Sequence, residues 1–199
     1  DLHSFSLVRD VLAQGNAPQF VFCVTIQNHG GYETGYDDGT GFCISAPAGN
    51  YPKATEYLQL IQQTDRAFAS FTQMLEELDE PTVVLMFGDH LPSVEQDFLD
   101  AVLSPDDPFA QRTTPFVLWA NYPVEWDGPE ETSLNFLGQY LLRYAGIEGD
   151  PYGAFLWDLQ KTLPALTFVG YTDALGEAYS HLETNAYTER IEDYQRMQY

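Results

Sequence analysis

The chain has 199 residues, and 44% of them are hydrophobic, which is enough for one substantial core and argues against disorder. Its 30 acidic and 8 basic residues give a formal net charge of -22, which would repel nucleic-acid phosphates and anionic membrane surfaces. We therefore expect a single domain over residues 1–199 and no nucleic-acid partner.

The first half of the chain reads as alternating helix and strand. Residues 4–14 carry apolar side chains at helical spacing, and residues 19–26, QFVFCVTI, form a continuous apolar run typical of a strand buried on both faces of a sheet. Residues 28–52 are rich in Gly, Asp, Tyr and Pro, which predicts a long functional loop. Residues 54–79 repeat apolar groups every three or four positions, which predicts a long helix.

The second half continues the same pattern. Residues 82–87 and 115–120 predict two further buried strands, and residues 94–102 predict a short helix between them. Helices are also predicted over residues 134–144, 152–163 and 187–199, and a short strand over residues 166–169. This order of elements predicts an α/β fold, a sheet flanked by helices.

The predicted strand 82–87 is followed at once by Gly88, Asp89 and His90. In open α/β sheets, ligands bind beyond the carboxyl ends of the strands. A carboxylate oxygen and an imidazole nitrogen from adjacent residues can converge on one divalent ion, and they suit Mn²⁺, Zn²⁺ or Mg²⁺. The alternative is an aspartate that caps the following loop beside a partly exposed histidine.

His29 follows the first predicted strand in the sequence TIQNHGGY. If the two strands are parallel neighbours, His29 lies on the same rim of the sheet as Asp89. Gly30 and Gly31 would let a ligand approach the backbone closely. The alternative is a structural or merely exposed histidine.

The sequence also bears on membrane insertion and on the state of the two cysteines. No apolar run approaches the roughly 20 residues that a membrane helix needs, so we expect the chain as given to be soluble. Cys23 and Cys43 are compatible with one disulfide or with two free thiols.

Four stretches of the sequence together resemble a known enzyme family: FVFCVTIQNHGGY (20–32), YLQLIQQTDRAFASFTQMLEELDEPTVVLMFGDHLPS (57–93), TTPFVLWANY (113–122) and DYQRMQY (193–199). The chain resembles the carboxyl-terminal half of the catalytic domain of the lipoteichoic acid synthase family. These enzymes are phosphoglycerol transferases with a sulfatase-like fold, in the alkaline phosphatase superfamily. The resemblance implies a sulfatase-like sheet that is incomplete because the N-terminal half of the domain is missing.

The resemblance also implies roles for individual residues. Asp89 and His90 match the paired metal ligands of the family, usually of Mn²⁺, and His29 matches the histidine that contacts the phosphoglycerol group. The threonine nucleophile and the glutamate that completes the metal site precede the NHGGY block in that family, so neither is assigned here. We therefore expect this chain to bind Mn²⁺, Mg²⁺ or Zn²⁺ weakly and to be inactive alone.

The implied parent enzyme is membrane-anchored and acts at the extracellular face of the bacterial cytoplasmic membrane. Its donor would be a phosphatidylglycerol-type lipid and its acceptor a glycerophosphate polymer, as in lipoteichoic acid synthesis. The alternatives are a sulfatase or phosphodiesterase of the same superfamily, or a non-catalytic domain that binds glycerophosphate. Because a truncated sheet exposes edges and apolar faces, we expect self-association or mobile segments.

Overall fold

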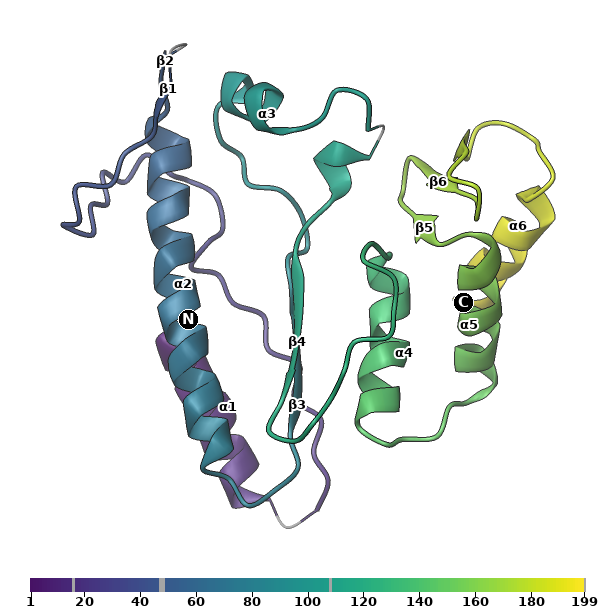
Figure 1. Ribbon diagram of the computed structural model, residues 1–199, viewed down its shortest axis with the longest axis horizontal. Helices are drawn as coiled ribbons and strands as arrows, with labels where there is room; N and C mark the ends of the chain where they lie inside the picture. The colour runs from purple at the N-terminus through teal and green to yellow at the C-terminus, as the bar shows by residue number, and fades with distance from the viewer. Residues whose placement is uncertain (16, 47–48, 108, 199) are drawn as a thin grey trace. The chain divides into compact units, whose positions relative to one another are not determined.

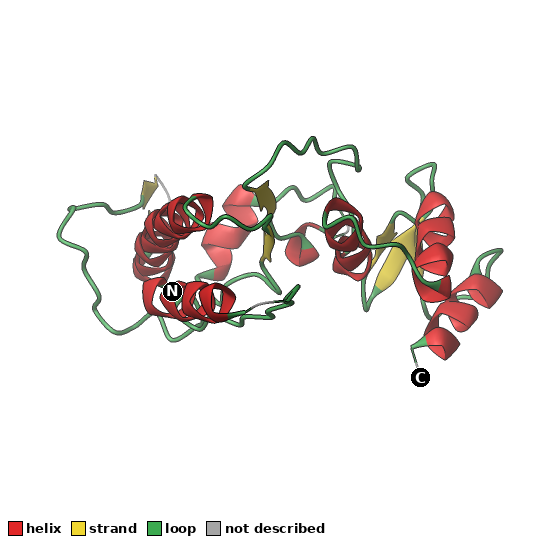
Figure 2. Ribbon diagram, turned by 90° about the horizontal axis from the view of Figure 1, so that it is seen from below, coloured by secondary structure: helices red, strands yellow, loops and turns green. Residues whose placement is uncertain are grey.

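A computed structural model describes residues 1–15, 17–46, 49–107 and 109–198. The chain divides into two compact units, the first formed by residues 1–82 and 88–115 and the second by residues 83–87 and 116–199. Helices and loops make up most of both units, with only short strands (Figure 2). This mixture confirms the predicted α/β class, whereas the single domain stays a prediction.

Two helices lie side by side in the first unit, α1 (Leu2–Gln14) and α2 (Pro52–Glu76) (Figure 1). Phe5 of α1 stacks on Phe71 of α2 with ring centroids 4.9 Å apart, and it meets the edge of Phe68 at 6.3 Å. Offset and edge-on aromatic pairs of this kind each contribute about 0.5–1.5 kcal/mol beyond their buried area. Both helices were predicted from their apolar spacing.

Residues 19–26, predicted as a buried strand, form no strand and are largely exposed. The exposed fractions of Phe20, Phe22, Val24 and Ile26 are 76%, 70%, 75% and 73%. The prediction was wrong because a continuous apolar run indicates burial only where partner strands or helices cover it. The parallel neighbour expected for this strand is also not seen, since every strand pair in the described part of the chain is antiparallel.

The long loop predicted over residues 28–52 is confirmed in its described residues, which include two short paired strands. Strands β1 (Ser45–Ala46) and β2 (Gly49–Asn50) pair antiparallel. The loop is attached to α2 by side chains: Gln59 Nε2 donates to the carbonyl of Phe42 at 2.9 Å. The first unit also contains α3 (Gln96–Val102), which confirms the short predicted helix, and a 3-10 turn, η1 (Ala110–Arg112).

The second unit begins with the strand pair β3 (Val83–Phe87) and β4 (Phe116–Ala120). Val83 lies opposite Ala120, and Phe87 lies opposite Phe116. Both strands were predicted from their β-branched and aromatic residues, but they pair antiparallel with each other and not as members of a parallel sheet. An apolar run does not specify strand direction, because any strand that is covered on both faces has this composition.

Three helices and a small sheet form the rest of the second unit. They are α4 (Leu134–Tyr144), α5 (Pro151–Thr162), β5 (Ala165–Leu166), β6 (Gly170–Thr172), β7 (Ala178–Ser180) and α6 (Thr188–Met197). The three helices were predicted, the strand over residues 166–169 is shorter than expected, and β6 and β7 were missed. Strands of two or three residues are too short to show an alternating pattern.

The core of this unit is aromatic and aliphatic. Phe136, Leu159, Leu163 and Tyr171 are each at most 1% exposed. Helix α5 contributes Leu156 and Leu159 to this core and is capped at its start, where the side chain of Asp150 accepts a hydrogen bond of 2.6 Å from the backbone N–H of Gly153. Such a cap satisfies one of the amide groups that a helix leaves unpaired at its start.

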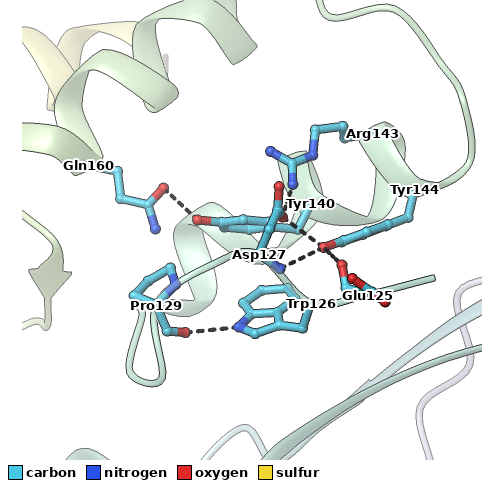
Figure 3. A network of polar contacts seen from close by, with 8 residues as sticks. All are labelled: Glu125, Trp126, Asp127, Pro129, Tyr140, Arg143, Tyr144 and Gln160. Carbon is cyan, nitrogen blue, oxygen red and sulfur yellow. Dashed lines mark hydrogen bonds and ion pairs between the residues drawn. The ribbon is translucent and has the colours of Figure 1, made fainter.

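A polar and aromatic cluster holds the loop before α4 against that helix (Figure 3). Arg143 forms an ion pair with Asp127, and its guanidinium carbon lies 5.3 Å from the ring centroid of Tyr144 and 5.4 Å from that of Trp157. The hydroxyl of Tyr144 donates to the backbone carbonyl of Glu125 at 2.8 Å. One arginine therefore joins the loop to the aromatic rings of α4 and α5.

Candidate functional site

Asp89 and His90 occupy an exposed turn directly after β3 in the sequence. The side chain of Asp89 is 80% exposed and that of His90 is 62% exposed. Asp89 Oδ1 accepts a hydrogen bond of 3.0 Å from the backbone N–H of His90. This bond fixes one carboxylate oxygen on the turn and leaves Oδ2 directed at the imidazole, 3.6 Å from His90 Nε2.

The imidazole of His90 is oriented by a backbone carbonyl. Its Nδ1 lies 2.9 Å from the carbonyl oxygen of Leu91, so Nδ1 carries the proton and donates it. The Nε2 lone pair is then free to bind a cation. Metal-ligating histidines usually donate their other ring N–H to a carbonyl or carboxylate in this way. Asp89 Oδ2 and His90 Nε2 are the two atoms that would hold a cation in this turn.

His29 lies in the turn that follows the exposed segment 19–26. Its backbone N–H donates to the carbonyl of Ile26 at 3.1 Å. The neighbouring Asn28 is held from two sides: its Nδ2 donates to Thr64 Oγ1 of α2 at 2.8 Å, and its carbonyl accepts from the Tyr32 hydroxyl at 2.6 Å. The position of His29 is therefore set by contacts of the residue before it.

Burial keeps the Tyr32 hydroxyl, which donates to the carbonyl of Asn28, in its protonated form. Tyr32 is 3% exposed, and desolvation, followed by the nearby Tyr57, raises the pKa of its hydroxyl. The hydroxyl therefore stays a donor to Asn28 at neutral pH.

The structure brings His29 and His90 together within the first unit. Their ring centroids are 6.3 Å apart, and the rings are inclined at 81°. The two loops also approach each other at a second point, because a Cβ atom built on Gly30 would lie 3.9 Å from the Cβ of Ser93. The predicted convergence of the two motifs is thus observed, although it does not arise from two parallel strands.

Sequence reasoning missed the residue that anchors the Asp89-His90 loop. Glu95 accepts hydrogen bonds from the backbone N–H groups of Lys53 and Ala54 at the start of α2. Lys53 in turn forms an ion pair of 2.9 Å with Glu33, in the loop after His29. The sequence around Glu95 does not predict this contact, because Lys53 and Ala54 are remote from it in the sequence.

The described residues do not contain a complete metal site. Within residues 1–15, 17–46, 49–107 and 109–198, no group of three or more His, Cys, Asp or Glu side chains is arranged to hold a metal ion. Asp89 and His90 fit a cation in ligand type and separation, but they supply two ligands. A tetrahedral or octahedral ion bound here would need further ligands from elsewhere.

A separate hollow of about 340 Å³ lies in the second unit. Its lining includes Asn135, Phe168, His181, Tyr194 and Gln195 and contains no carboxylate. His181 Nε2 donates to the carbonyl of Thr167 at 2.7 Å. This hollow is distinct from the predicted site, and without a carboxylate it is a poor match for a divalent cation.

Cys23 and Cys43 are free, exposed thiols in the structure, which decides between the two alternatives left open by the sequence. None of the helices in the described part of the chain is long and apolar enough to cross a membrane.

Comparison with known proteins identifies the family. The profile of the Sulfatase family matches residues 4–147, a range that includes His29, Asp89 and His90. A putative cyclic beta-1,2-glucan modification protein of Rhizobium meliloti (strain 1021) is 29% identical over 169 residues, which cover 76% of this chain and 26% of that protein. The chain thus spans about a quarter of the length of this relative. No solved structure matches the chain. Because the Sulfatase profile covers well over half of the sequence, the chain belongs to the Sulfatase family.

Proposed function

We propose that this chain carries part of the active site of a metal-dependent phosphoglycerol transferase. Asp89 and His90 would be two of the metal ligands, and His29 would contact the phosphoglycerol group of the substrate. The observation that supports this most directly is the approach of His29 and His90 to 6.3 Å between ring centroids. A phosphate group held by a cation at one loop would be within reach of an imidazole at the other.

The residues of this chain would act by binding and orienting. Asp89 Oδ2 and His90 Nε2 would hold the cation, and the Leu91 carbonyl would keep the His90 tautomer that leaves Nε2 unprotonated. When bound, the cation would neutralise charge on the nonbridging phosphate oxygens and lower the pKa of a hydroxyl nucleophile. His29 would donate a hydrogen bond to the phosphoglycerol group. The nucleophile is not assigned to this chain.

The proposed donor is a phosphatidylglycerol-type phosphodiester, and the acceptor is a hydroxyl group of an envelope polymer. The Rhizobium protein is named for modification of a cyclic beta-1,2-glucan. A glucan hydroxyl and the terminal hydroxyl of a glycerophosphate polymer are chemically similar acceptors. We propose a parent enzyme that is membrane-anchored and acts outside the cytoplasm, where such polymers are assembled.

A second candidate is hydrolysis of a sulfate ester or a phosphodiester. Membership of the Sulfatase family favours it, because members of this family are metal-dependent in general and the two ligands described here would serve either reaction. The two functions differ in the nucleophile and in the acceptor, which is water in hydrolysis and a polymer hydroxyl in transfer. Both would use the same residues of this site.

The metal site can be tested with the four histidines of the chain as internal reporters. We expect titration with Mn²⁺ to broaden the imidazole NMR signals of His29 and His90 at lower metal concentration than those of His3 and His181. The affinity should be weak, since loss of supporting groups alone costs roughly 10- to 100-fold and further ligands are needed here. Equal broadening of all four signals would contradict the proposed site.

Matched variants separate specific binding from the attraction of Mn²⁺ to a chain of net charge -22. Asp89→Asn should abolish the selective broadening of His90. Asp97→Asn removes the same charge from the exposed surface of α3 and should leave the selectivity unchanged. Tight stoichiometric binding by the unmodified chain would show instead that the metal site is complete.

A further inference from the structure

Residues 19–27 form an exposed segment with the character of an unpaired strand. Phe20, Phe22, Val24 and Ile26 are between 70% and 76% exposed and Cys23 is also exposed, whereas Val21 and Thr25 are partly buried. The β-branched and aromatic residues of this segment are typical of a strand. From Phe20 to Thr25 the backbone N–H and C=O groups have no hydrogen-bond partner among the described residues.

The sequence of this segment is nearly symmetrical about Cys23. Residues equally distant from Cys23 are similar in type: Phe22 and Val24, Val21 and Thr25, Phe20 and Ile26, Gln19 and Gln27. If two copies pair antiparallel with Cys23 opposite Cys23, each aromatic ring lies opposite a β-branched aliphatic side chain. Such cross-strand pairs each contribute roughly 0.2–1 kcal/mol relative to alanine pairs.

We propose that residues 19–27 pair antiparallel with the same residues of a second copy of this chain, in register about Cys23. This inference goes beyond the proposed function and does not depend on a metal at His90. Pairing would satisfy backbone groups that are otherwise left to water, which is the known hazard of an open strand edge. An extended segment that is apolar, uncharged and free of internal proline is also the kind most prone to self-pairing.

Charge distinguishes this segment from the rest of the chain. Residues 17–28 contain no Asp, Glu, Lys or Arg, although the chain as a whole has a net charge of -22. The strands therefore meet without like charges opposite each other. The remaining charge of the two copies repels at longer range, and salt screens that repulsion. The pairing should strengthen as the salt concentration rises.

The first experiment measures mass in solution by sedimentation velocity, as a function of protein concentration, at low and at high NaCl. We expect a monomer–dimer equilibrium that shifts toward dimer with concentration and with salt. Val24→Lys places a charge beside its symmetry mate and should shift the chain to monomer. Leu182→Lys is the matched control, because Leu182 is 95% exposed but lies outside the segment, and it should leave the dimer intact.

The second experiment tests the register. Directly opposite residues in an antiparallel pair have Cα atoms about 4.5–5.5 Å apart, which is within the range for a disulfide. Diamide should therefore join two copies: the two Cys23 thiols lose two protons and two electrons to diamide, which is reduced to its hydrazine, and a disulfide forms. Cys43→Ser should keep this cross-link and Cys23→Ser should lose it, because both thiols are exposed but only Cys23 is at the centre.

A chain that stays monomeric at all concentrations and salt levels would overturn the proposal. Cross-linking through Cys43 as readily as through Cys23 would also overturn it, since the contact would then be random collision. A dimer that Val24→Lys leaves intact would place the interface elsewhere.

Discussion

Glu95 Oε1 accepts a hydrogen bond of 2.8 Å from the backbone N–H of Lys53, at the first turn of α2. Its other oxygen accepts from the N–H of Ala54 at 3.0 Å. One carboxylate thus satisfies two of the amide groups that the start of a helix leaves unpaired, and its charge suits the positive end of the helix dipole. Because Glu95 and His90 share a loop, this contact also ties the candidate metal ligands to the longest helix.

We predict that Glu95→Gln destabilises the first unit at neutral pH by about 1 kcal/mol, the usual worth of a helix cap. Desolvation alone would raise the pKa of Glu95, but hydrogen bonds from the Lys53 and Ala54 amides outweigh it and the pKa lies below its usual value. A lowered pKa contributes stability above the unfolded-state pKa, and this stability is lost as pH falls through the folded-state value. Thermal melts between pH 3 and 7 should therefore show a weaker acid dependence in the variant.

The control for this prediction is Asp106→Asn, which removes an exposed acidic side chain elsewhere in the same unit. It should leave both the melting temperature at pH 7 and its acid dependence close to those of the unmodified chain. If Glu95→Gln behaves like this control, the cap does not stabilise α2.

A second prediction concerns Gly88, which separates β3 from Asp89. A Cβ atom at this position would lie 3.1 Å from the Cβ of Thr114 and 3.4 Å from its Cγ2. Thr114 cannot easily move away, because its hydroxyl donates to the Gly88 carbonyl at 2.7 Å. We expect Gly88→Ala to destabilise the protein by about 1–3 kcal/mol through overpacking, as measured by urea unfolding.

Gly138 supplies the matched control, because it lies within α4 and a Cβ built there meets no atom within 4 Å. Gly138→Ala should stabilise the protein by about 0.5–1 kcal/mol, since alanine loses less entropy than glycine in a helix. Equal effects of the two substitutions would mean that the contact with Thr114 is not restrictive.

The elements that could be predicted from the sequence are those whose signal is local and repeated. Helix α2 was expected over residues 54–79 and spans Pro52–Glu76, because many apolar positions at one spacing define it. Residues 19–26 have an equally strong apolar signal, yet they are exposed. An apolar sequence indicates that burial of the segment would be favourable. Whether the segment is buried depends on other elements that pack on it, and the sequence of the segment does not specify those elements.

The same distinction applies to the candidate site. Asp89 and His90 are adjacent in the sequence, so their shared turn could be predicted. The approach of His29 was also expected, but on the basis of parallel strands that the described residues do not form. Glu95 was not anticipated, because its hydrogen bonds to Lys53 and Ala54 connect distant segments through backbone amides that have no sequence signature.

A third prediction is that this chain alone does not turn over phosphodiesters. A metal ion held by Asp89 and His90 would need further ligands, and no nucleophile is assigned beside these two residues. Incubation with bis(4-nitrophenyl) phosphate and Mn²⁺ should release nitrophenol at the rate of the metal ion alone. Release above this rate that is lost in His90→Ala would show that the chain already contains a working site, and His181→Ala is the control for loss of a histidine elsewhere.

A fourth prediction tests the arginine cluster of the second unit (Figure 3). Arg143→Lys keeps the positive charge beside Asp127, but it loses the planar guanidinium that lies 5.3–5.5 Å from the ring centroids of Tyr140, Tyr144 and Trp157. We expect a loss of about 0.5–1 kcal/mol, typical of a partly exposed cation–π contact, measured by urea unfolding. Arg196→Lys is the control, because Arg196 pairs with the carboxylates of Glu192 and Asp193 on its own helix and should tolerate lysine.

The last prediction concerns Asp173, which is 4% exposed and is surrounded by donors. Its Oδ1 accepts from the backbone N–H groups of Leu175 at 2.9 Å and Glu177 at 3.0 Å. Its Oδ2 accepts from the hydroxyls of Tyr179 at 3.2 Å and Tyr187 at 3.0 Å. Desolvation alone would raise the pKa of Asp173, but these hydrogen bonds outweigh it and hold the pKa below its usual value.

Asp173→Asn replaces one accepting oxygen by an NH₂ group, so either the two amides or the two tyrosine hydroxyls lose their acceptor. We expect a lower melting temperature at pH 7. Because the pKa of Asp173 is lowered on folding, its contribution is present above the unfolded-state pKa, about 3.9, and is lost as pH falls through the folded-state value. The melting temperatures of the variant and the unmodified chain should therefore converge below about pH 4, whereas Glu183→Gln, at an exposed position, should match the unmodified chain throughout. A constant difference at all pH values would mean that the charge of Asp173 does not contribute.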